Sequence, residues 1–113
     1  VSGYIDYVSD GSRIYAVEPR VGEDHVVNKI IHRVTGLGCL VSAIMAAFLA
    51  VEDAVKAAVE GFALFKAVTI KAAEESPYPG SFHVKIYDWL YRVDRDIVLE
   101  NVVVREVEPQ RVY

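Results

Sequence analysis

The sequence has one cysteine, no cluster of basic residues and no apolar stretch long enough to cross a bilayer. A single cysteine excludes an internal disulfide. Twelve basic residues against sixteen acidic ones give a net charge of -4, which argues against nucleic acid as a partner, because its phosphates bind clustered Lys and Arg. The longest apolar stretch, residues 39–51, is shorter than the ~20 residues of a membrane span. We therefore expect neither a nucleic acid nor a membrane partner.

The start of the chain carries no signal-peptide pattern, and we place the protein in the reducing cytoplasm, where an unpaired thiol is common. With 113 residues, 53% of them hydrophobic, the chain can bury a core without a structural metal, and we predict one domain over residues 1–113. The first residue is Val1 rather than Met, and residues 1–3 resemble the end of a strand. We expect the chain to be part of something longer.

Two short runs rich in aromatic and β-branched residues, 4–8 and 13–17, flank Asp10-Gly11 and predict a β-hairpin. Residues 19–33 have a mixed composition with Pro19 and Gly22 as breakers, and we predict a surface excursion that returns as a short strand or turn. Residues 102–107 predict a closing strand before a polar tail.

Three helices are expected between these strands. Residues 39–50 carry no charge on any face, which predicts a helix that is buried all round. Glu52 and Asp53 suit the start of a long amphipathic helix that runs to about residue 74. Gly61 lies inside this helix at a cost of about 1 kcal/mol relative to Ala, which is tolerated if it permits close helix packing. The predicted inner face is Val55, Ala58, Val59, Phe62, Phe65, Val68 and Ala72.

The break at residues 76–80 precedes a third helix, for which Ser81 is the predicted cap. Asp94 then caps a short helical turn to Leu99. The order of hairpin, helices and strand predicts an α/β fold in which helices cover a sheet. The predicted inner face of the third helix is Val84, Ile86, Trp89, Leu90 and Val93.

The strongest local signal for chemistry is Thr35-Gly36-Leu37-Gly38-Cys39. Two glycines before a helix allow a tight turn, and the first N–H groups of the helix lack intrahelical partners. These amides and the helix dipole form an anion site, whose field favours the thiolate of Cys39. The competing interpretation is a simple tight turn with Cys39 as a small core residue.

Other sites are poorly supported. The P-loop pattern is absent, and Val41 stands where a dinucleotide fingerprint needs its third glycine. His25, His32 and His83 show no metal-ligand spacing, and a nucleophilic pair of Cys39 with His32 would need a third, orienting group, so solvated histidines are favoured. The seven tyrosines and Trp89 are expected to be core or interface aromatics.

Three stretches in order resemble the hydroxyethylthiazole kinases, the thiamine-salvage branch of the ribokinase-like fold. They are residues 33–43 (Arg-Val-Thr-Gly-Leu-Gly-Cys-Leu-Val-Ser-Ala), residues 1–11 (Val-Ser-Gly-Tyr-Ile-Asp-Tyr-Val-Ser-Asp-Gly), and residues 79–91, with Pro-Gly-Ser-Phe leading to Tyr-Asp-Trp-Leu-Tyr. The resemblance implies a ribokinase-like layered sheet with covering helices, of which this chain is only the C-terminal portion.

The resemblance further implies transfer of the γ-phosphate of ATP, with Mg²⁺, to the primary alcohol of 4-methyl-5-(2-hydroxyethyl)thiazole. Cys39 falls where most ribokinase-like enzymes carry a catalytic aspartate, Gly36 matches a substrate-loop glycine, and Ser2 matches the Thr or Ser that contacts ATP. The amides of Gly36, Leu37, Gly38 and Cys39 would hold the phosphoryl group as an anion hole. Because a neutral thiol is a poor base, Cys39 would mainly position the alcohol.

The chain also departs from the family. Leu37 replaces the usual Thr or Ala, and residues 19–33 form a longer segment that lacks the usual Asn-Gly-His. The family's N-terminal half supplies the thiazole pocket, the acidic Mg²⁺ groups and a basic ATP contact, so we expect no metal ligand in this chain. Family members form trimers with active sites between subunits. The rival hypotheses are a non-catalytic oligomerisation or binding module on the same scaffold and, more weakly, a thiol-based redox or nucleophilic protein.

Overall fold

In the computed structural model, which describes residues 2–107, three strands form one antiparallel sheet in the order β1-β2-β3. β1 (Asp6–Ser9) and β2 (Ile14–Pro19) form the predicted hairpin, whose turn contains Gly11 with a φ of 95°. β3 (Val102–Val107) is the predicted closing strand and pairs with β2. The sequence therefore predicted all three strands, although the first begins at Asp6 rather than at residue 4.

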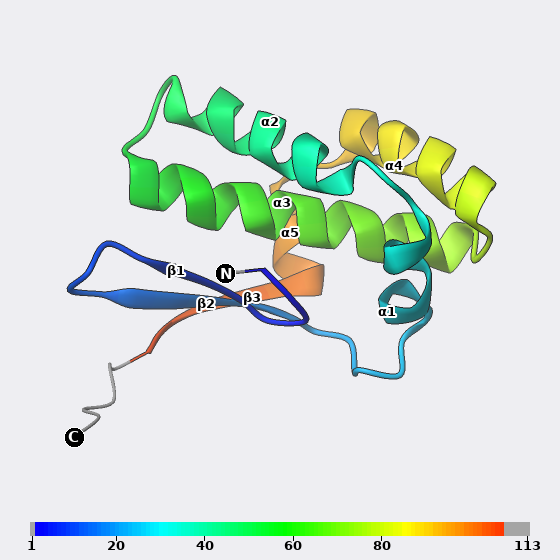
Figure 1. Ribbon diagram of the computed structural model, residues 1–113, viewed down its shortest axis with the longest axis horizontal. Helices are drawn as coiled ribbons and strands as arrows, with labels where there is room; N and C mark the ends of the chain where they lie inside the picture. The colour runs from blue at the N-terminus through cyan, green and yellow to red at the C-terminus, as the bar shows by residue number, and fades with distance from the viewer. Residues whose placement is uncertain (1, 108–113) are drawn as a thin grey trace.

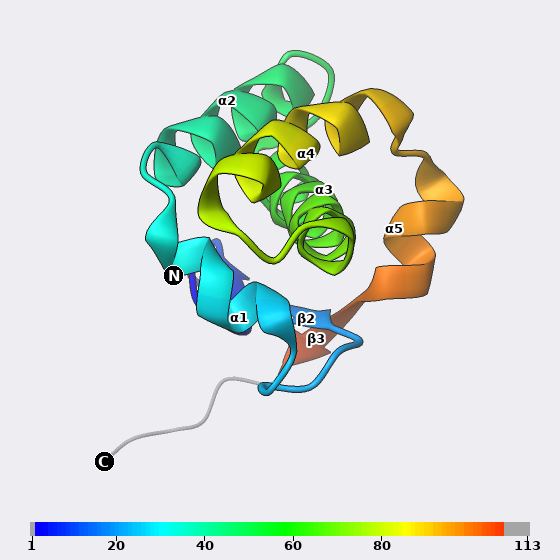
Figure 2. The ribbon, with the colours of Figure 1, turned by 90° about the vertical axis from the view of Figure 1, so that its right-hand side faces the viewer.

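A long helix, α3 (Ala54–Glu75), lies against one face of this sheet at the centre of the molecule (Figure 1). It packs against all three strands and against four other helices. Of these, α2 (Leu37–Leu49) and α4 (Pro79–Arg92) form an outer layer on the far side of α3, while α1 (Val26–Ile30) and α5 (Arg95–Asn101) flank it (Figure 2). The predicted α/β layering, with helices covering a sheet, is confirmed.

The central helix begins where the sequence predicts, because the Asp53 side chain accepts a hydrogen bond from the Lys56 N–H (2.9 Å). Its Gly61 faces α2: a Cβ atom there would lie 2.5 Å from Cγ and 3.2 Å from Cα of Met45. The close helix packing expected for this glycine is thus present. α3 is buried on more sides than one amphipathic face, at Ala57, Gly61, Ala63, Ala67, Val68, Thr69, Ile70, Ala72 and Ala73.

The largest part of the core lies between α3 and α4. Phe82, Ile86 and Trp89 of α4 pack with Val68 and Ile70 of α3. These three residues follow a spacing of four and three, so they share one side of the helix.

Two details predicted for α4 are wrong. Ser81 is not its cap, since the helix begins at Pro79 with Tyr78 as the N-cap residue, and proline is favoured at the first helical position because it lacks an N–H. Val84 is not on the inner face, because it lies two residues from both Phe82 and Ile86 and is therefore turned away and exposed. The prediction that Asp94 caps the next helix is confirmed, since its carboxylate accepts from the Ile97 N–H (2.9 Å).

The segment between β2 and α2 is helical, not the short strand or turn that its sequence suggested. The N-cap of α1 is His25, whose Nδ1 accepts a hydrogen bond from the Val27 N–H (3.1 Å), and the 3₁₀ turn η1 (Ile31–Arg33) follows α1 directly. Val27 and Ile30, three residues apart, are both buried in the core. Burial of this helical pair overrides the strand preference of β-branched residues.

The prediction of an all-round buried α2 is also wrong. Among the described residues of this helix only Leu37 is buried, and Leu49 is 54% exposed. α2 packs on α3 with one side, and no other described element covers its opposite side. A helix that is apolar all round is therefore left with an open apolar surface.

Within residues 2–107, no single helix has the length and apolar character to cross a membrane. Two consecutive helical segments, Val26–Arg33 and Leu37–Leu49, are together long and apolar enough for a span, but only by length and composition. They are bent by 101° at the break between them.

Candidate functional site

The loop before α2 has the backbone geometry that its sequence predicts. Gly36 is the N-cap residue in a left-handed conformation, with a φ of 85°, and no side chain caps the helix. Its carbonyl accepts the N–H of Leu40 (3.1 Å), which is the first intrahelical bond. The N–H groups of Leu37, Gly38 and Cys39 precede that bond and have no intrahelical partner. The start of α2 therefore offers three amide donors and the positive end of its dipole to an anion.

The side chains of this loop have separate environments. Leu37 is buried in the main core and fixes the start of α2. Cys39 is exposed, so the interpretation of Cys39 as a small core residue is wrong. Ser42 donates from Oγ to the Gly38 carbonyl (3.0 Å), within the first turns of the helix.

A cavity of about 630 Å³ opens beside this loop, between the start of β1, α1, α2 and α3. Among the residues predicted for the site, Ser2, Leu37 and Gly38 line the cavity, whereas Gly36 and Cys39 do not. The cavity thus brings Ser2, the predicted ATP contact, together with part of the predicted anion hole, Leu37 and Gly38. The remaining lining residues are Gly3, Tyr4, Asp6, Pro19, Glu23, Val27, Asn28, Ile31, His32, Val41, Phe62, Phe65, Lys66, Thr69 and Ile70.

The cavity wall contains a buried ion pair that the sequence analysis missed. Lys66 of α3 lies 3.0 Å, from Nζ to Oδ2, from Asp6 of β1. Asp6 shares a sheet face with Val8, and Lys66 lies among apolar residues of a central helix. A charge at each of two otherwise core-facing positions is the sequence signal that could have revealed the pair.

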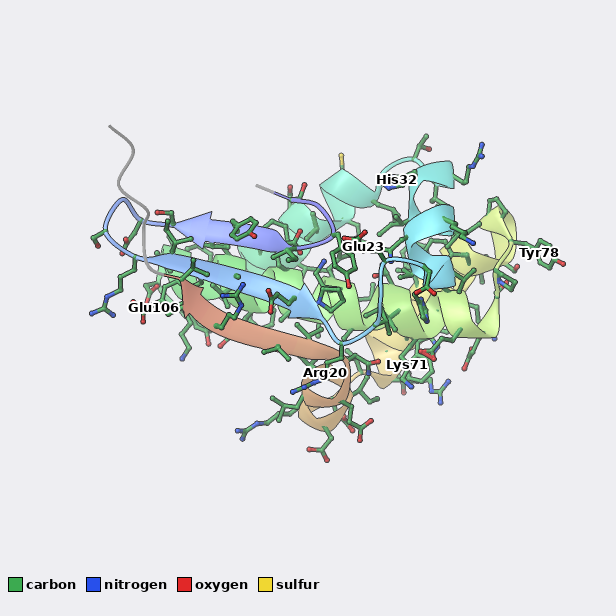
Figure 3. The ribbon with its side chains drawn as sticks, turned by 90° about the horizontal axis from the view of Figure 1, so that it is seen from below. Arg20, Glu23, His32, Lys71, Tyr78 and Glu106 are labelled. Atoms are coloured by element: carbon green, nitrogen blue, oxygen red, sulfur yellow. The ribbon has the colours of Figure 1, made fainter. Side chains whose placement is uncertain are left out.

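The histidines do not form a common site. His25 caps α1, and its Nε2 lies 3.9 Å from Oε1 of Glu74. His83 packs against Tyr87 on α4, with ring centroids 5.5 Å apart. His32 lines the cavity from η1, and Glu23 lines it from the connection between β2 and α1 (Figure 3). No group of three His, Cys, Asp or Glu side chains within residues 2–107 is placed to hold a metal ion.

The aromatic residues of α4 divide between core and surface. Trp89 is buried, with the Arg92 guanidinium 3.9 Å and the Lys71 ammonium 5.9 Å from its ring. Tyr87 and Tyr91 are exposed on the outer side of α4. The expectation of core or interface aromatics is confirmed for Trp89.

The model of the hydroxyethylthiazole kinase family matches residues 1–96. The chain belongs to this family. Relatives named hydroxyethylthiazole kinase include those of Pyrococcus abyssi, 46% identical over 95% of this chain, and Methanococcus maripaludis, 43% identical over 96% of it. Each match covers 38% of the relative, so the chain spans well under half the length of the family members it resembles.

A solved structure supports the same assignment. The structure of the hydroxyethylthiazole kinase protein from Pyrococcus horikoshii OT3 superposes with a TM-score of 0.84 at 45% identity. It covers 96% of this chain, and the chain covers 40% of that structure. The predicted resemblance of the chain to the C-terminal part of the hydroxyethylthiazole kinases is thereby confirmed.

For a kinase family, the donor set of the cavity can be tested against a nucleotide phosphate and against Mg²⁺. The Leu37 and Gly38 N–H groups and the Ser2 hydroxyl belong to residues that line the cavity, and they supply the hydrogen-bond donors that phosphate oxygens require. The carboxylates that line the cavity are Asp6 and Glu23, and both oxygens of Asp6 are already engaged, by Lys66 and by the Gly3 N–H. These donors fit a phosphate, and the engagement of both Asp6 oxygens leaves that carboxylate poorly suited to hold Mg²⁺.

Proposed function

We propose that the chain forms the phosphate-holding part of a kinase that transfers the γ-phosphate of ATP to the hydroxyethyl group of 4-methyl-5-(2-hydroxyethyl)thiazole. The observation that carries this proposal is the start of α2, where Gly36 turns the chain and leaves three amides free beside a cavity that also contains Ser2. Phosphoryl transfer depends mainly on positioning and charge neutralisation, which such an amide cradle supplies.

In this proposal, the amides of residues 36–39 hold the phosphoryl group as its charge shifts, and Gly36 contacts the substrate. Ser2 donates its hydroxyl to ATP. Cys39, exposed at the first turn of α2, positions the substrate alcohol. Mg²⁺ would neutralise phosphate charge when bound, and its ligands would come from outside the described residues. The basic ATP contact and the thiazole pocket would also lie outside this chain.

The proposed partners are the remaining part of a family member, ATP, the thiazole alcohol and, as the family resemblance implies, further copies in a homotrimer. The open apolar side of α2 and the exposed Tyr87 and Tyr91 of α4 support a protein partner, because large apolar patches on a surface mark contact sites. We also propose that the protein acts in the cytoplasm.

An assay of the full-length gene product with ATP, Mg²⁺ and the thiazole alcohol tests the function through formation of thiazole phosphate. Cys39→Ala is expected to lower kcat on the order of tenfold or more, because the alcohol loses its positioning group. Cys39→Asp supplies a carboxylate base and is expected to differ from both the wild type and Cys39→Ala. Arg95→Gln, at an exposed residue of α5, is the control and should leave kcat unchanged.

The alternative, a non-catalytic module on the same scaffold, predicts a different result. Such a protein would form no thiazole phosphate, and its melting temperature would not rise with ATP and Mg²⁺, whereas a nucleotide site stabilises the folded state by mass action. Absence of product together with unchanged melting would reject the kinase proposal. Product formation unaffected by both Cys39 variants would reject the role of Cys39.

A further inference from the structure

The backbone of residues 2–4 is held from three sides where it forms part of the cavity wall. The Gly3 N–H donates to Oδ1 of Asp6 (2.9 Å), and the carbonyls of Gly3 and Tyr4 accept from Nζ of Lys66 (3.3 and 3.0 Å). The Tyr4 hydroxyl donates to the Val21 carbonyl (2.6 Å) in the segment that leads to α1. These contacts fix the stretch next to Ser2 relative to α3 and to the opposite wall of the cavity.

The ion pair behind this segment is unusual because both side chains are almost fully buried. The Lys66 side chain is 11% exposed and that of Asp6 is 5% exposed. A buried pair adds little net stability compared with well-packed apolar side chains, because both charges lose their hydration. Stability alone therefore does not account for charges at these two positions, whereas the fixed geometry of segment 2–4 does.

Lys66 also lines the cavity, but it has no free hydrogen to offer a ligand. Its ammonium carries three donors, and they match three acceptors: Oδ2 of Asp6 and the carbonyls of Gly3 and Tyr4. Lys66 thus differs from a lysine that binds phosphate directly. Any effect of Lys66 on a phosphate in the cavity acts through the segment that it holds.

We propose that Lys66 and Asp6 are positioning residues that fix segment 2–4 so that the Ser2 hydroxyl meets a nucleotide phosphate in the cavity. This proposal rests on the proposed function, in which Ser2 contacts ATP. The Tyr4 hydroxyl is a third group that positions segment 2–4, because its hydrogen bond joins the segment to the β2–α1 connection, which forms another part of the cavity wall.

The test measures the dissociation constant of ATP with Mg²⁺ by calorimetry, using the full-length gene product and its variants. Lys66→Met is expected to weaken ATP binding about tenfold or more, and Lys66→Arg, which keeps the charge and several donors, should restore part of the affinity. Lys56→Met is the matched control, because Lys56 lies on the same helix but is exposed. Its Nζ lies 3.7 Å from Oε1 of Glu52, a longer distance than that between Lys66 and Asp6. It should bind ATP like the wild type.

A second variant and a second measurement keep the proposal testable if Lys66→Met does not fold. Tyr4→Phe keeps the ring and removes only the donor to Val21, so it should fold and weaken ATP binding about threefold. Hydrogen exchange at the Gly3 amide should become faster in folded Lys66→Met. The loss of a direct contact with ATP, without loosening of segment 2–4, would not cause this faster exchange. If Lys66→Met does not fold, wild-type affinity in Tyr4→Phe overturns the proposal.

The outcomes separate this proposal from the proposed function. Folded Lys66→Met that binds ATP with wild-type affinity overturns the positioning role, even if Gly3 exchanges faster, while the kinase proposal stands. A wild-type protein that does not bind ATP overturns both. The positioning role is supported if Lys66→Met and Tyr4→Phe both bind ATP more weakly and the Gly3 amide exchanges faster in Lys66→Met. The Lys56→Met control should then bind ATP with normal affinity.

Discussion

The two glycines at the start of α2, Gly36 and Gly38, have different structural roles, although they lie two residues apart. Gly36 adopts a φ of 85°, in the left-handed region that side chains disfavour, and a Cβ there would meet nothing within 4 Å. Gly38 lies inside α2, has no positive φ and has equal space for a Cβ. The backbone conformation, not steric crowding, therefore requires glycine at position 36.

Gly36→Ala should lower the free energy of unfolding by about 1–2 kcal/mol, because the left-handed backbone conformation is unfavourable for a residue with a Cβ atom. Gly38→Ala should leave stability unchanged or raise it by up to about 1 kcal/mol, because alanine is the better helix former. Urea unfolding of both variants measures the difference. Equal stabilities for the two variants would contradict the assigned backbone strain.

Asp10 in the β1–β2 turn should give the fold an acid-sensitive contribution. The N–H groups of Arg13 and Ser12 and the Ser12 hydroxyl donate to its carboxylate and lower its pKa from 3.8 to about 2. A carboxyl whose folded pKa is lowered stabilises the fold above its unfolded pKa, and this contribution is lost as pH falls from 3.8 towards about 2.

Melting temperatures across that pH range test the effect of Asp10. Asp10→Asn should show a smaller fall in melting temperature than the wild type, because it has no carboxylate to protonate. Asp24→Asn, at an exposed aspartate, controls for the change in net charge. Parallel curves for Asp10→Asn and the wild type would rule out the effect.

At the scale of elements, the contact between α2 and α3 depends on the absence of a side chain at Gly61. A Cβ at this position would press on the backbone and the side chain of Met45, so the two helices would have to separate. Gly61→Ala should therefore destabilise the fold by about 1–3 kcal/mol, despite the better helix propensity of alanine.

Thermal unfolding of Gly61→Ala checks this expectation, with Gly80→Ala as the control. Gly80 lies in the first turn of α4, and its Cβ would meet nothing within 4 Å. Gly80→Ala should be neutral or stabilising. A Gly61→Ala protein as stable as the wild type would show that α2 can move without cost.

The sequence predicted the strands, α3 and the glycine turn before α2 because each depends on local signals: the Asp10-Gly11 turn, the Asp53 cap and the paired glycines. It failed where tertiary burial decides. Val27 and Ile30 become helical because together they enter the core, and α2 is open because no described element covers its outer side. The Lys66–Asp6 pair was missed because it joins residues sixty positions apart in sequence.

At the scale of the whole molecule, the outer layer presents apolar side chains to solvent, including Tyr91 at 95% exposure and Leu49 at 54%. We expect a protein of residues 1–113 to self-associate as its concentration rises, because such surfaces gain free energy when covered. Ala47→Glu, on the exposed side of α2, should shift the sedimentation profile towards monomer. Arg95→Glu, on α5, should not, and equal profiles for the wild type and Ala47→Glu would contradict this expectation.

The central position of α3 also determines how the protein unfolds. Because α3 contacts the sheet and four helices, its middle cannot unwind while the rest stays folded. Amides of residues 67–70, whose side chains are at most 1% exposed, should exchange with solvent only through global unfolding. Their exchange free energy would then equal the unfolding free energy from denaturant titration, and faster exchange there would reveal a partly open state in which α3 separates from its neighbours.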